Sequence, residues 1–365
     1  MLRRRFLALF CAALPLLACT KLLDVDFDAR DRNLVTPNDR PDGEDGDGGR
    51  LPDGAFPPET GDGAPTEQDI LARLRVRVAD ATSAYFASSS WLYWTDTTNA
   101  GHGYRPVDKA TRLLPANIRY GNDDFVIVAD TPTVGLTYAA DTSLLADTFT
   151  YGAGMPVALA SGVVSFDLNA GDNTTIPKVW RPSAPGVHTP APAIATIQPS
   201  MLGRAEDTIY LRDFAAPTKM FAFGLPAATT ASIALPFAPI AVVPLGTTLV
   251  LVRFEGAFIG MQLLNPSRDL GAAINNATST VPVEDRAPLD LPVAIDDWLI
   301  YSAAGGLLAF HPGDDRLIPL QLRSDIDSFT FDGVRALQGA KHVAFVITSG
   351  PTGLYVLDVR GLLGL

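Results

Sequence analysis

Three aspartates stand at matching places in this chain, and they are its first candidates for chemistry. Asp96, Asp130 and Asp213 each close a short run of apolar or β-branched residues. Carboxylates that end equivalent strands of a repeating fold would gather at one mouth, where they could bind calcium or another ligand. The other interpretation, that each aspartate caps a turn or bonds the backbone of a neighbouring repeat, stays open at this point.

This sequence contains few cysteine and histidine residues that could take part in catalysis or metal binding. The only cysteines are Cys11 and Cys19, so disulfides, zinc–thiolate sites, iron–sulfur clusters and cysteine nucleophiles are excluded beyond Cys19. The four histidines are isolated from one another in sequence, which favours solvated or structural roles; they are His102, His188, His311 and His342. The chain holds no G-x-S-x-G, P-loop, H-E-x-x-H or dinucleotide motif. The sequence therefore predicts no cofactor and no metal site.

The charge balance bears on the class of partner. The 365 residues carry 28 Lys and Arg against 40 Asp and Glu, which is a formal net charge of −12. A protein that neutralises phosphates needs basic clusters, so the composition argues against nucleic-acid binding. The length suits two or three average domains or one large all-β domain.

The first nineteen residues have the features of a targeting sequence. Arg3–Arg5 precede the apolar run Phe6–Ala18, which is too short to span a bilayer and is typical of a signal peptide. The run ends in Leu16-Leu17-Ala18-Cys19, which resembles a bacterial lipobox. Residues 1–18 are therefore predicted to be removed, and Cys19 to carry acyl chains such as palmitate. Thr20 stands where an aspartate would signal inner-membrane retention, which predicts the outer membrane. An ordinary secretory signal and a twin-arginine signal are the alternatives.

An acidic segment follows, and with Cys19 it makes up residues 19–68. Between residues 24 and 68 there are 13 acidic and 4 basic side chains and few large apolar ones. Such a composition cannot offset the entropy of ordering the chain, so a disordered linker is predicted. The linker would hold the folded body away from the lipid surface.

The remaining residues, 69–365, carry short β-branched or aromatic runs bounded by Gly, Pro, Asn and Asp, which is typical of strands. The runs recur at intervals of 34, 31, 52, 40, 50 and 45 residues when one position in each is followed; the positions are Tyr93, Ile127, Ala158, Tyr210, Val250, Ile300 and Phe345. A four-stranded propeller blade takes ~40–50 residues. The sequence therefore predicts an all-β fold, a single β-propeller of seven blades, in preference to two β-sandwiches.

One repeat contains a motif with a known context. Tyr93-Trp94-Thr95-Asp96 is a literal YWTD motif. Its surroundings resemble the YWTD-type β-propeller repeats of low-density-lipoprotein-receptor relatives and of many bacterial surface lipoproteins. The resemblance implies a structural role for the aspartate beside a turn. Asp130 and Asp213 keep the fourth position of the motif and the other repeats do not, so the family's count of six blades is not carried over.

The last predicted hairpin lacks an outer strand, because the chain ends there. Residues 73–78 alternate Arg with Leu or Val, which is strand periodicity. We expect this segment to complete the last blade beside residues 353–360 and to cover its open edge.

Two further features have competing interpretations. Aromatic residues could form a carbohydrate platform, but most of them lie inside predicted strands, which favours packing between blades; they are Trp91, Tyr93, Trp94, Trp180, Trp298 and Tyr301. Residues 221–252 carry no charge and could suggest a membrane span. Four prolines break any helix in that segment, so strands and turns are predicted instead.

These features together predict a membrane-tethered propeller lipoprotein that is not an enzyme and that binds an envelope protein or a glycan through its loops. The alternative is a propeller enzyme, lactonase-like or lyase-like, that works with a central metal. The sequence leaves open whether the body faces the periplasm or the exterior.

Overall fold

The computed structural model describes residues 75–80, 84–130, 133–138, 145–150, 154–169, 171–172, 174–194, 200–225, 227–322, 331–347 and 352–365. The chain divides into two compact units, Met1–Ala72 and Arg73–Leu365, and all described residues belong to the second. The predicted signal peptide, Cys19 and the predicted linker lie outside the described residues. Within the described ranges, no helix has the length and apolar character needed to cross a membrane.

Seven antiparallel sheets of four strands make up the second unit, and we number these blades along the chain. Blade 1 contains β2 (Ala84–Ala87), β3 (Leu92–Thr95), β4 (Gly101–Arg105) and β5 (Ala110–Leu114). Blade 2 contains β6 (Ile118–Gly121), β7 (Phe125–Asp130), β8 (Thr133–Tyr138) and β9 (Leu145–Thr150). Blade 3 contains β10 (Gly154–Leu159), β11 (Gly162–Asn169), β12 (Thr174–Trp180) and β13 (His188–Pro190). Blade 4 contains β14 (Ser200–Ala205), β15 (Thr208–Arg212), β16 (Lys219–Gly224) and β17 (Thr229–Ala234).

The last three blades follow the same order. Blade 5 contains β18 (Ala241–Leu245), β19 (Thr248–Glu255), β20 (Phe258–Leu263) and β21 (Arg268–Asp269). Blade 6 contains β22 (Val293–Ile295), β23 (Trp298–Ala303), β24 (Gly306–His311) and β25 (Arg316–Leu322). Blade 7 contains β26 (Phe331–Leu337), β27 (His342–Ile347), β28 (Gly353–Asp358) and β1 (Arg75–Ala79). The short helices are α3 (Leu270–Asn276), η1 (Val283–Asp285) and α4 (Arg360–Leu363).

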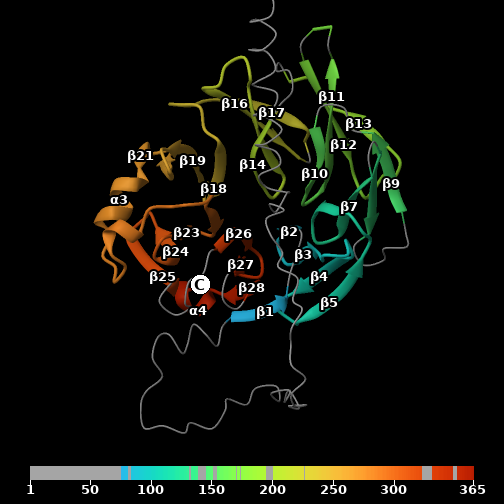
Figure 1. The fold of residues 1–365 in the computed structure, drawn as a ribbon. Coiled ribbons are helices and arrows are strands. Elements are labelled where there is room, and N and C mark those ends of the chain that lie inside the picture. Colours follow the sequence, from blue (N-terminus) through green and yellow to red (C-terminus); the bar gives the residue numbers. More distant parts are fainter. Residues whose placement is uncertain are drawn as a thin grey trace, which may run out of the picture. The chain divides into compact units, whose positions relative to one another are not determined.

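The blades form a closed ring around the first strand of each sheet. These innermost strands contact one another in the order β2, β6, β10, β14, β18, β22 and β26, and β26 contacts β2 again. Figure 1 shows the sheets following one another around this ring. The predicted seven-bladed propeller is confirmed. The uncharged segment 221–252 forms strands β16 to β19 and their connections, as predicted.

The predicted closing strand is also confirmed. β1 pairs antiparallel with β28, with Arg75 opposite Leu357 and Arg77 opposite Tyr355, so the start of the second unit supplies the outer strand of blade 7 (Figure 1). The Arg75 guanidinium lies 5.2 Å from the centroid of the Tyr355 ring, and Arg77 donates a hydrogen bond to the carbonyl of Thr352. One outer edge of the last blade is thereby covered.

One of the seven sequence markers was wrong. Ala158 lies in β10, the innermost strand of blade 3, whereas the other six markers lie in the second strand of their blades. The tight turn at Ser161-Gly162 joins the first and second strands of this blade. Val164 in β11 is the corresponding position, which makes the two affected intervals 37 and 46 residues. Asp167 then takes the place that Asp96, Asp130 and Asp213 hold in their repeats.

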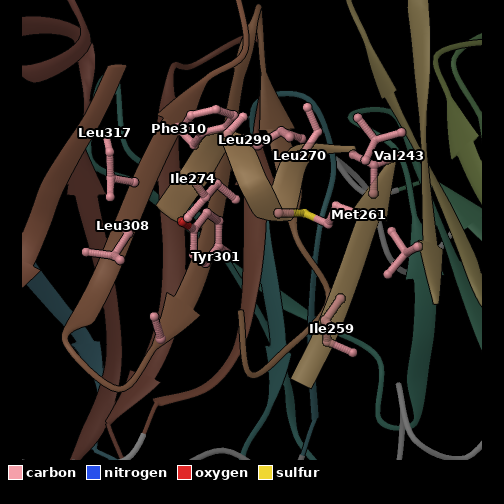
Figure 2. Packing of buried hydrophobic residues seen from close by; sticks show 14 of the residues in the cluster. Val243, Ile259, Met261, Leu270, Ile274, Leu299, Tyr301, Leu308, Phe310 and Leu317 are labelled. Carbon is pink, nitrogen blue, oxygen red and sulfur yellow. The ribbon is translucent and has the colours of Figure 1, made fainter. Parts of the chain in front are cut away.

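The core is built at the seams between blades, because each sheet buries both faces against its neighbours. The largest cluster joins blades 5 and 6 and includes Val243, Met261, Tyr301 and Phe310. Figure 2 shows helix α3 covering this seam with Leu270 and Ile274. The aromatic residues that were candidates for a carbohydrate platform are buried in the same way, which confirms the packing interpretation; they are Trp91, Tyr93, Trp94, Trp180, Trp298 and Tyr301.

A buried cation holds the connection between blades 5 and 6. Arg286 is only 5% exposed and its guanidinium donates to backbone carbonyls at and beyond the end of α3, among them Ala277 (2.8 Å), Val281 (2.9 Å) and Asn275 (3.0 Å). A helix end leaves carbonyl groups without partners inside the helix. The arginine satisfies several of them at once, and this fixes the path of the chain toward blade 6.

Deletion of the closing strand tests its contribution to stability. Removal of residues 1–80, which eliminates β1, is expected to cost about 3–5 kcal/mol because a ladder of backbone hydrogen bonds and the packing of Val78 are lost. At about 2–4 °C per kcal/mol, the melting temperature should fall by roughly 10 °C or more in circular dichroism. Removal of residues 1–72, which keeps β1, is the matched control. Equal melting temperatures for the two truncations would contradict a closing role for β1.

Candidate functional site: one face of the ring

The two faces of the ring carry different turns. Since the strands of each blade alternate in direction, the turns between second and third strands lie on the same face as the connections between blades. We call this the connection face. The turns between first and second strands, and between third and fourth strands, lie on the opposite side, which we call the latch face. Asp96, Asp130 and Asp213 each stand at or directly after the end of a second strand, so all three belong to the connection face.

Asp96 organises the turn that follows the YWTD sequence. Its Oδ1 accepts hydrogen bonds from the backbone N–H groups of Thr98 (2.8 Å) and Ala100 (3.0 Å) and from the Thr98 hydroxyl (2.7 Å). Its Oδ2 lies 2.9 Å from His102 Nε2. The hydrogen bond from His102, followed by that from Thr98, lowers the pKa of Asp96 well below its ordinary range. Both carboxylate oxygens therefore have protein partners in this turn.

Asp213 occupies the corresponding turn of blade 4 and is 4% exposed. Its Oδ1 accepts from the backbone N–H of Ala215 at 3.0 Å, and its Oδ2 lies 3.9 Å from Lys219 Nζ. Asp130 ends β7, but its side chain lies outside the described residues. The three carboxylates thus share a face and belong to three different blades. Within the described ranges, no three His, Cys, Asp or Glu side chains lie close enough to hold a metal ion. Ligand binding by these aspartates stays a prediction.

Among the side chains that the structure describes on the connection face, the most exposed aromatic ones lie on blade 5. Phe254 and Phe258 stand at the two ends of the β19–β20 turn and are 62% and 46% exposed. Leu289, on the connection toward blade 6, is 49% exposed, and the neighbouring backbone atoms Ile259 N and Pro288 O are joined by a 2.9 Å hydrogen bond. In the hairpin register Phe254 lies opposite Ile259 and Phe258 lies opposite Glu255, so the two rings project from opposite sides of the blade-5 sheet. We call these exposed residues at the tip of blade 5, Phe254, Phe258 and Leu289, the aromatic patch.

The surroundings of the aromatic patch are mixed in character. Arg253 lies with its guanidinium 4.8 Å from the ring centroid of Phe237, which belongs to the connection between blades 4 and 5. The same guanidinium donates through Nε to Glu255 Oε1 at 2.6 Å. Phe214, next to Asp213 on blade 4, is a further exposed aromatic residue of this face. Apolar side chains and an ion pair are thus presented together, as in the core and rim of a protein interface.

Sequence reasoning missed the aromatic patch. Two phenylalanines four residues apart around Gly256 were the available signal, because a glycine turn flanked by large apolar side chains leaves them little to pack against. Their exposure depends on the neighbouring blades and was not readable from the pattern.

A groove of about 440 Å³ lies at the seam where the ring closes. The closing strand β1 forms one wall with Val76 and Val78, and blade 1 forms the other with Trp94, Tyr104 and Arg112. Burial lowers the pKa of Arg112 and raises that of Tyr104. The Arg112 guanidinium stacks on Trp91, with 3.3 Å between its central carbon and the ring centroid. The groove therefore combines apolar walls with a cation that is already engaged by an aromatic ring.

The carboxylates of the latch face join neighbouring blades. Asp123 Oδ1 of blade 2 accepts from the Ser88 hydroxyl (2.5 Å) and the Ser90 N–H (3.0 Å) of blade 1. Asp207 Oδ1 of blade 4 accepts from the Ser161 N–H of blade 3 at 2.7 Å. Lys341 of blade 7 donates to Asp296 of blade 6 at 2.5 Å. The acidic pairs at 123–124 and 296–297 lie between the first and second strands of blades 2 and 6.

Each histidine lies beside an aspartate of the same or a neighbouring blade. His188 Nε2 is 2.6 Å from Asp147 Oδ2, and His311 Nδ1 is 2.6 Å from Asp314 Oδ1. His342 Nδ1 donates to the carbonyl of Ala340, and burial lowers the pKa of this imidazole. With His102 beside Asp96, all four imidazoles have protein partners, in agreement with the structural roles expected from their isolation in the sequence.

Comparisons with known proteins find likenesses of fold only. No family model matches the chain, and no curated protein matches its sequence. The β-propeller domain of Cps50 (Swd1) of Myceliophteria thermophila is 9% identical, with 78% of this chain and 98% of that chain covered and a TM-score of 0.48. BamB from Moraxella catarrhalis is 11% identical, with 77% and 85% covered and a TM-score of 0.40. Hsv2 of Kluyvelomyces marxianus is 10% identical, with 74% and 90% covered and a TM-score of 0.46.

The Asp96 turn predicts a specific pH dependence of stability. The folded pKa of Asp96 is lowered, so its contribution is present above the ordinary aspartate pKa of ~3.9 and is lost as the pH falls toward the folded value. Asn at this position cannot titrate. Between about pH 4 and pH 2, the wild-type protein should therefore lose stability more steeply than Asp96→Asn, while it is the more stable of the two at neutral pH. Urea unfolding midpoints across this range measure the difference, and parallel profiles would contradict the prediction.

Proposed function

We propose that the chain is a lipoprotein of the bacterial outer membrane whose β-propeller binds another envelope protein through its connection face. The single observation that carries this proposal is the aromatic patch, Phe254, Phe258 and Leu289, exposed on two adjoining segments of that face. Several exposed apolar side chains around the tip of one blade, with charged side chains beside them, are typical of protein interfaces. The lipobox-like Leu16–Cys19 sequence supports the lipid anchor, and the YWTD-type turn around Asp96 supports the likeness to propeller repeats of surface lipoproteins.

The chemistry of the aromatic patch favours a protein partner over a glycan. Sugars are recognised by hydrogen-bonding groups that surround a flat aromatic platform, and every tryptophan of this chain is buried. Phenylalanine and leucine side chains instead provide apolar contact area without polar atoms. Arg253 and Glu255, which lie beside the patch, would form the polar rim of a protein interface. A glycan partner is the alternative, and the lactonase- or lyase-like enzyme stays an untested prediction.

The aromatic patch is tested by pull-down of the full chain from detergent-solubilised envelopes. Phe254→Ser combined with Phe258→Ser is expected to weaken capture of the partner roughly 30-fold, equivalent to about 2 kcal/mol, because interface energy concentrates in a few apolar anchors. Val187→Ser is the matched control, since Val187 is 53% exposed in a turn of the latch face. Thermal melting of all variants confirms folding. Equal capture by the double variant and the wild type would contradict the proposal, and capture of purified glycan in place of protein would favour the alternative.

The lipid anchor is tested separately. Cys19→Ser is expected to abolish incorporation of labelled palmitate and to move the protein from the outer-membrane fraction to the soluble envelope fraction, because the acylated thiol is the proposed attachment. Cys11→Ser is the matched control, since Cys11 lies within the predicted signal peptide. Retention of label and membrane association by Cys19→Ser would contradict the anchor while leaving the connection-face proposal intact.

A further inference from the structure

The outer edges of the seven blades are not protected equally. An outer strand presents backbone N–H and C=O groups that another strand can pair with, and proteins block such edges with charges, proline, shortness or coverage. Six outer strands carry such protection. Charged residues protect β1 (Arg75 and Arg77), β5 (Arg112), β9 (Asp147) and β25 (Arg316, together with Pro319). The other two are short: β13 has three residues and ends in Pro190, and β21 has two residues and leads into α3. β17, the outer strand of blade 4, has none of these features.

β17 is six residues long, contains no charge and no proline, and is exposed over nearly its whole length. Its sequence, Thr-Thr-Ala-Ser-Ile-Ala, consists of small and β-branched residues that suit an extended strand. Only Ile233 is partly buried, where it packs against the cluster between blades 4 and 5. Among the described residues, no strand pairs with the outer side of β17.

The register shows which backbone groups of β17 face outward. The N–H of Leu235 donates to the carbonyl of Thr218 at 2.7 Å, so this opposed pair is a hydrogen-bonded one. In an antiparallel ladder, hydrogen-bonded and non-hydrogen-bonded pairs alternate. Ile233 and Ala231 therefore bond inward to β16, whereas Thr230, Ser232 and Ala234 direct their N–H and C=O groups away from the blade.

We propose that β17 accepts an extended, uncharged strand from a partner polypeptide, which continues the sheet of blade 4 as a fifth strand. The three outward residues offer alternating donors and acceptors at the spacing of a β-ladder, and only an extended backbone matches that spacing. Small neutral side chains allow close approach and give a charged strand no ion pair. This surface is the outer circumference of the ring, so the proposal does not rest on the connection face.

A partner polypeptide fits this edge better than a second copy of the chain. Two β17 strands that pair antiparallel are related by a twofold axis perpendicular to the sheet. Because each blade extends outward from the ring axis, this operation turns the second ring over, so that its connection face points the opposite way. Two rigid rings would also touch only along two six-residue edges, well below the roughly 1,000 Å² of a stable interface, whereas a flexible polypeptide can continue past β17 onto further surface. A flexible strand has neither constraint.

Binding of a strand is tested with the detergent-solubilised full chain and a fluorescent peptide that copies residues 227–236. Saturable anisotropy is expected for the wild type. Ser232→Pro removes only an outward N–H, which an edge strand tolerates, and should weaken binding at least tenfold. Ser232→Val keeps the N–H and is the matched control. Ser232→Lys, which places a charge on the edge, is a second blocking variant in case the proline disturbs folding, and melting temperatures are compared throughout.

Hydrogen exchange locates the contact. The amides of Thr230, Ser232 and Ala234 should exchange rapidly in the free protein and slowly with the peptide bound, while those of Ala231 and Ile233 change little. Absence of saturable binding to the wild type, or equal binding by Ser232→Pro and Ser232→Lys, would overturn the proposal. Self-association of the full chain in sedimentation, abolished by Ser232→Pro, would overturn the assignment to a partner in favour of a second copy.

Discussion

Each blade of this propeller packs its inner strands against neighbouring blades, so its core is complete only when the ring is closed. Closure places the strongest constraint at the seam between blades 7 and 1, where the chain must return to its beginning. The antiparallel pairing of β1 with β28 meets this constraint, with Val356 opposite Val76 and Tyr355 under Arg75. Across the seam, Leu354 and Val356 of blade 7 share a cluster with Leu92 and Trp94 of blade 1. The positions of all the loops follow from this closure.

The two faces of the ring have different roles. On the latch face, carboxylates bond to hydroxyl and N–H groups of the preceding blade, as Asp123 does to Ser88 and Asp207 to Ser161. A carboxylate that accepts several hydrogen bonds while partly buried is a strong and directional link. Residues of this face therefore hold the spacing between blades. The connection face has turns such as that of Asp96, which satisfy their own polar groups, and it presents exposed apolar side chains at the β19–β20 turn and on the connection toward blade 6.

Much of the fold was predictable because it depends on local patterns. Short apolar runs separated by turn residues specified the hairpins, and the Arg–Val alternation before residue 80 specified the closing strand. The error in blade 3 has a physical cause: a tight turn at Ser161-Gly162 looks the same whether it joins the first pair of strands or the second. The site was less accessible. The exposure of Phe254 and the partners of Asp213 depend on residues from neighbouring blades, and no periodicity encodes them.

Blade 4 carries the open edge and also reaches the connection face. β16 begins after the Asp213 turn on the connection face, and its first residue, Lys219, lies opposite Ala234 at the end of β17. Lys219 Nζ is also 3.9 Å from Asp213 Oδ2, so this residue approaches the turn with its side chain, while its backbone lies opposite the strand that carries the open edge. Ala234 is thus at the end of the edge that lies on the side of the connection face. A polypeptide whose extended part pairs with β17 could continue onto the connection face. The two surfaces would then bind one partner together, and binding at one surface would raise the effective concentration of the partner at the other.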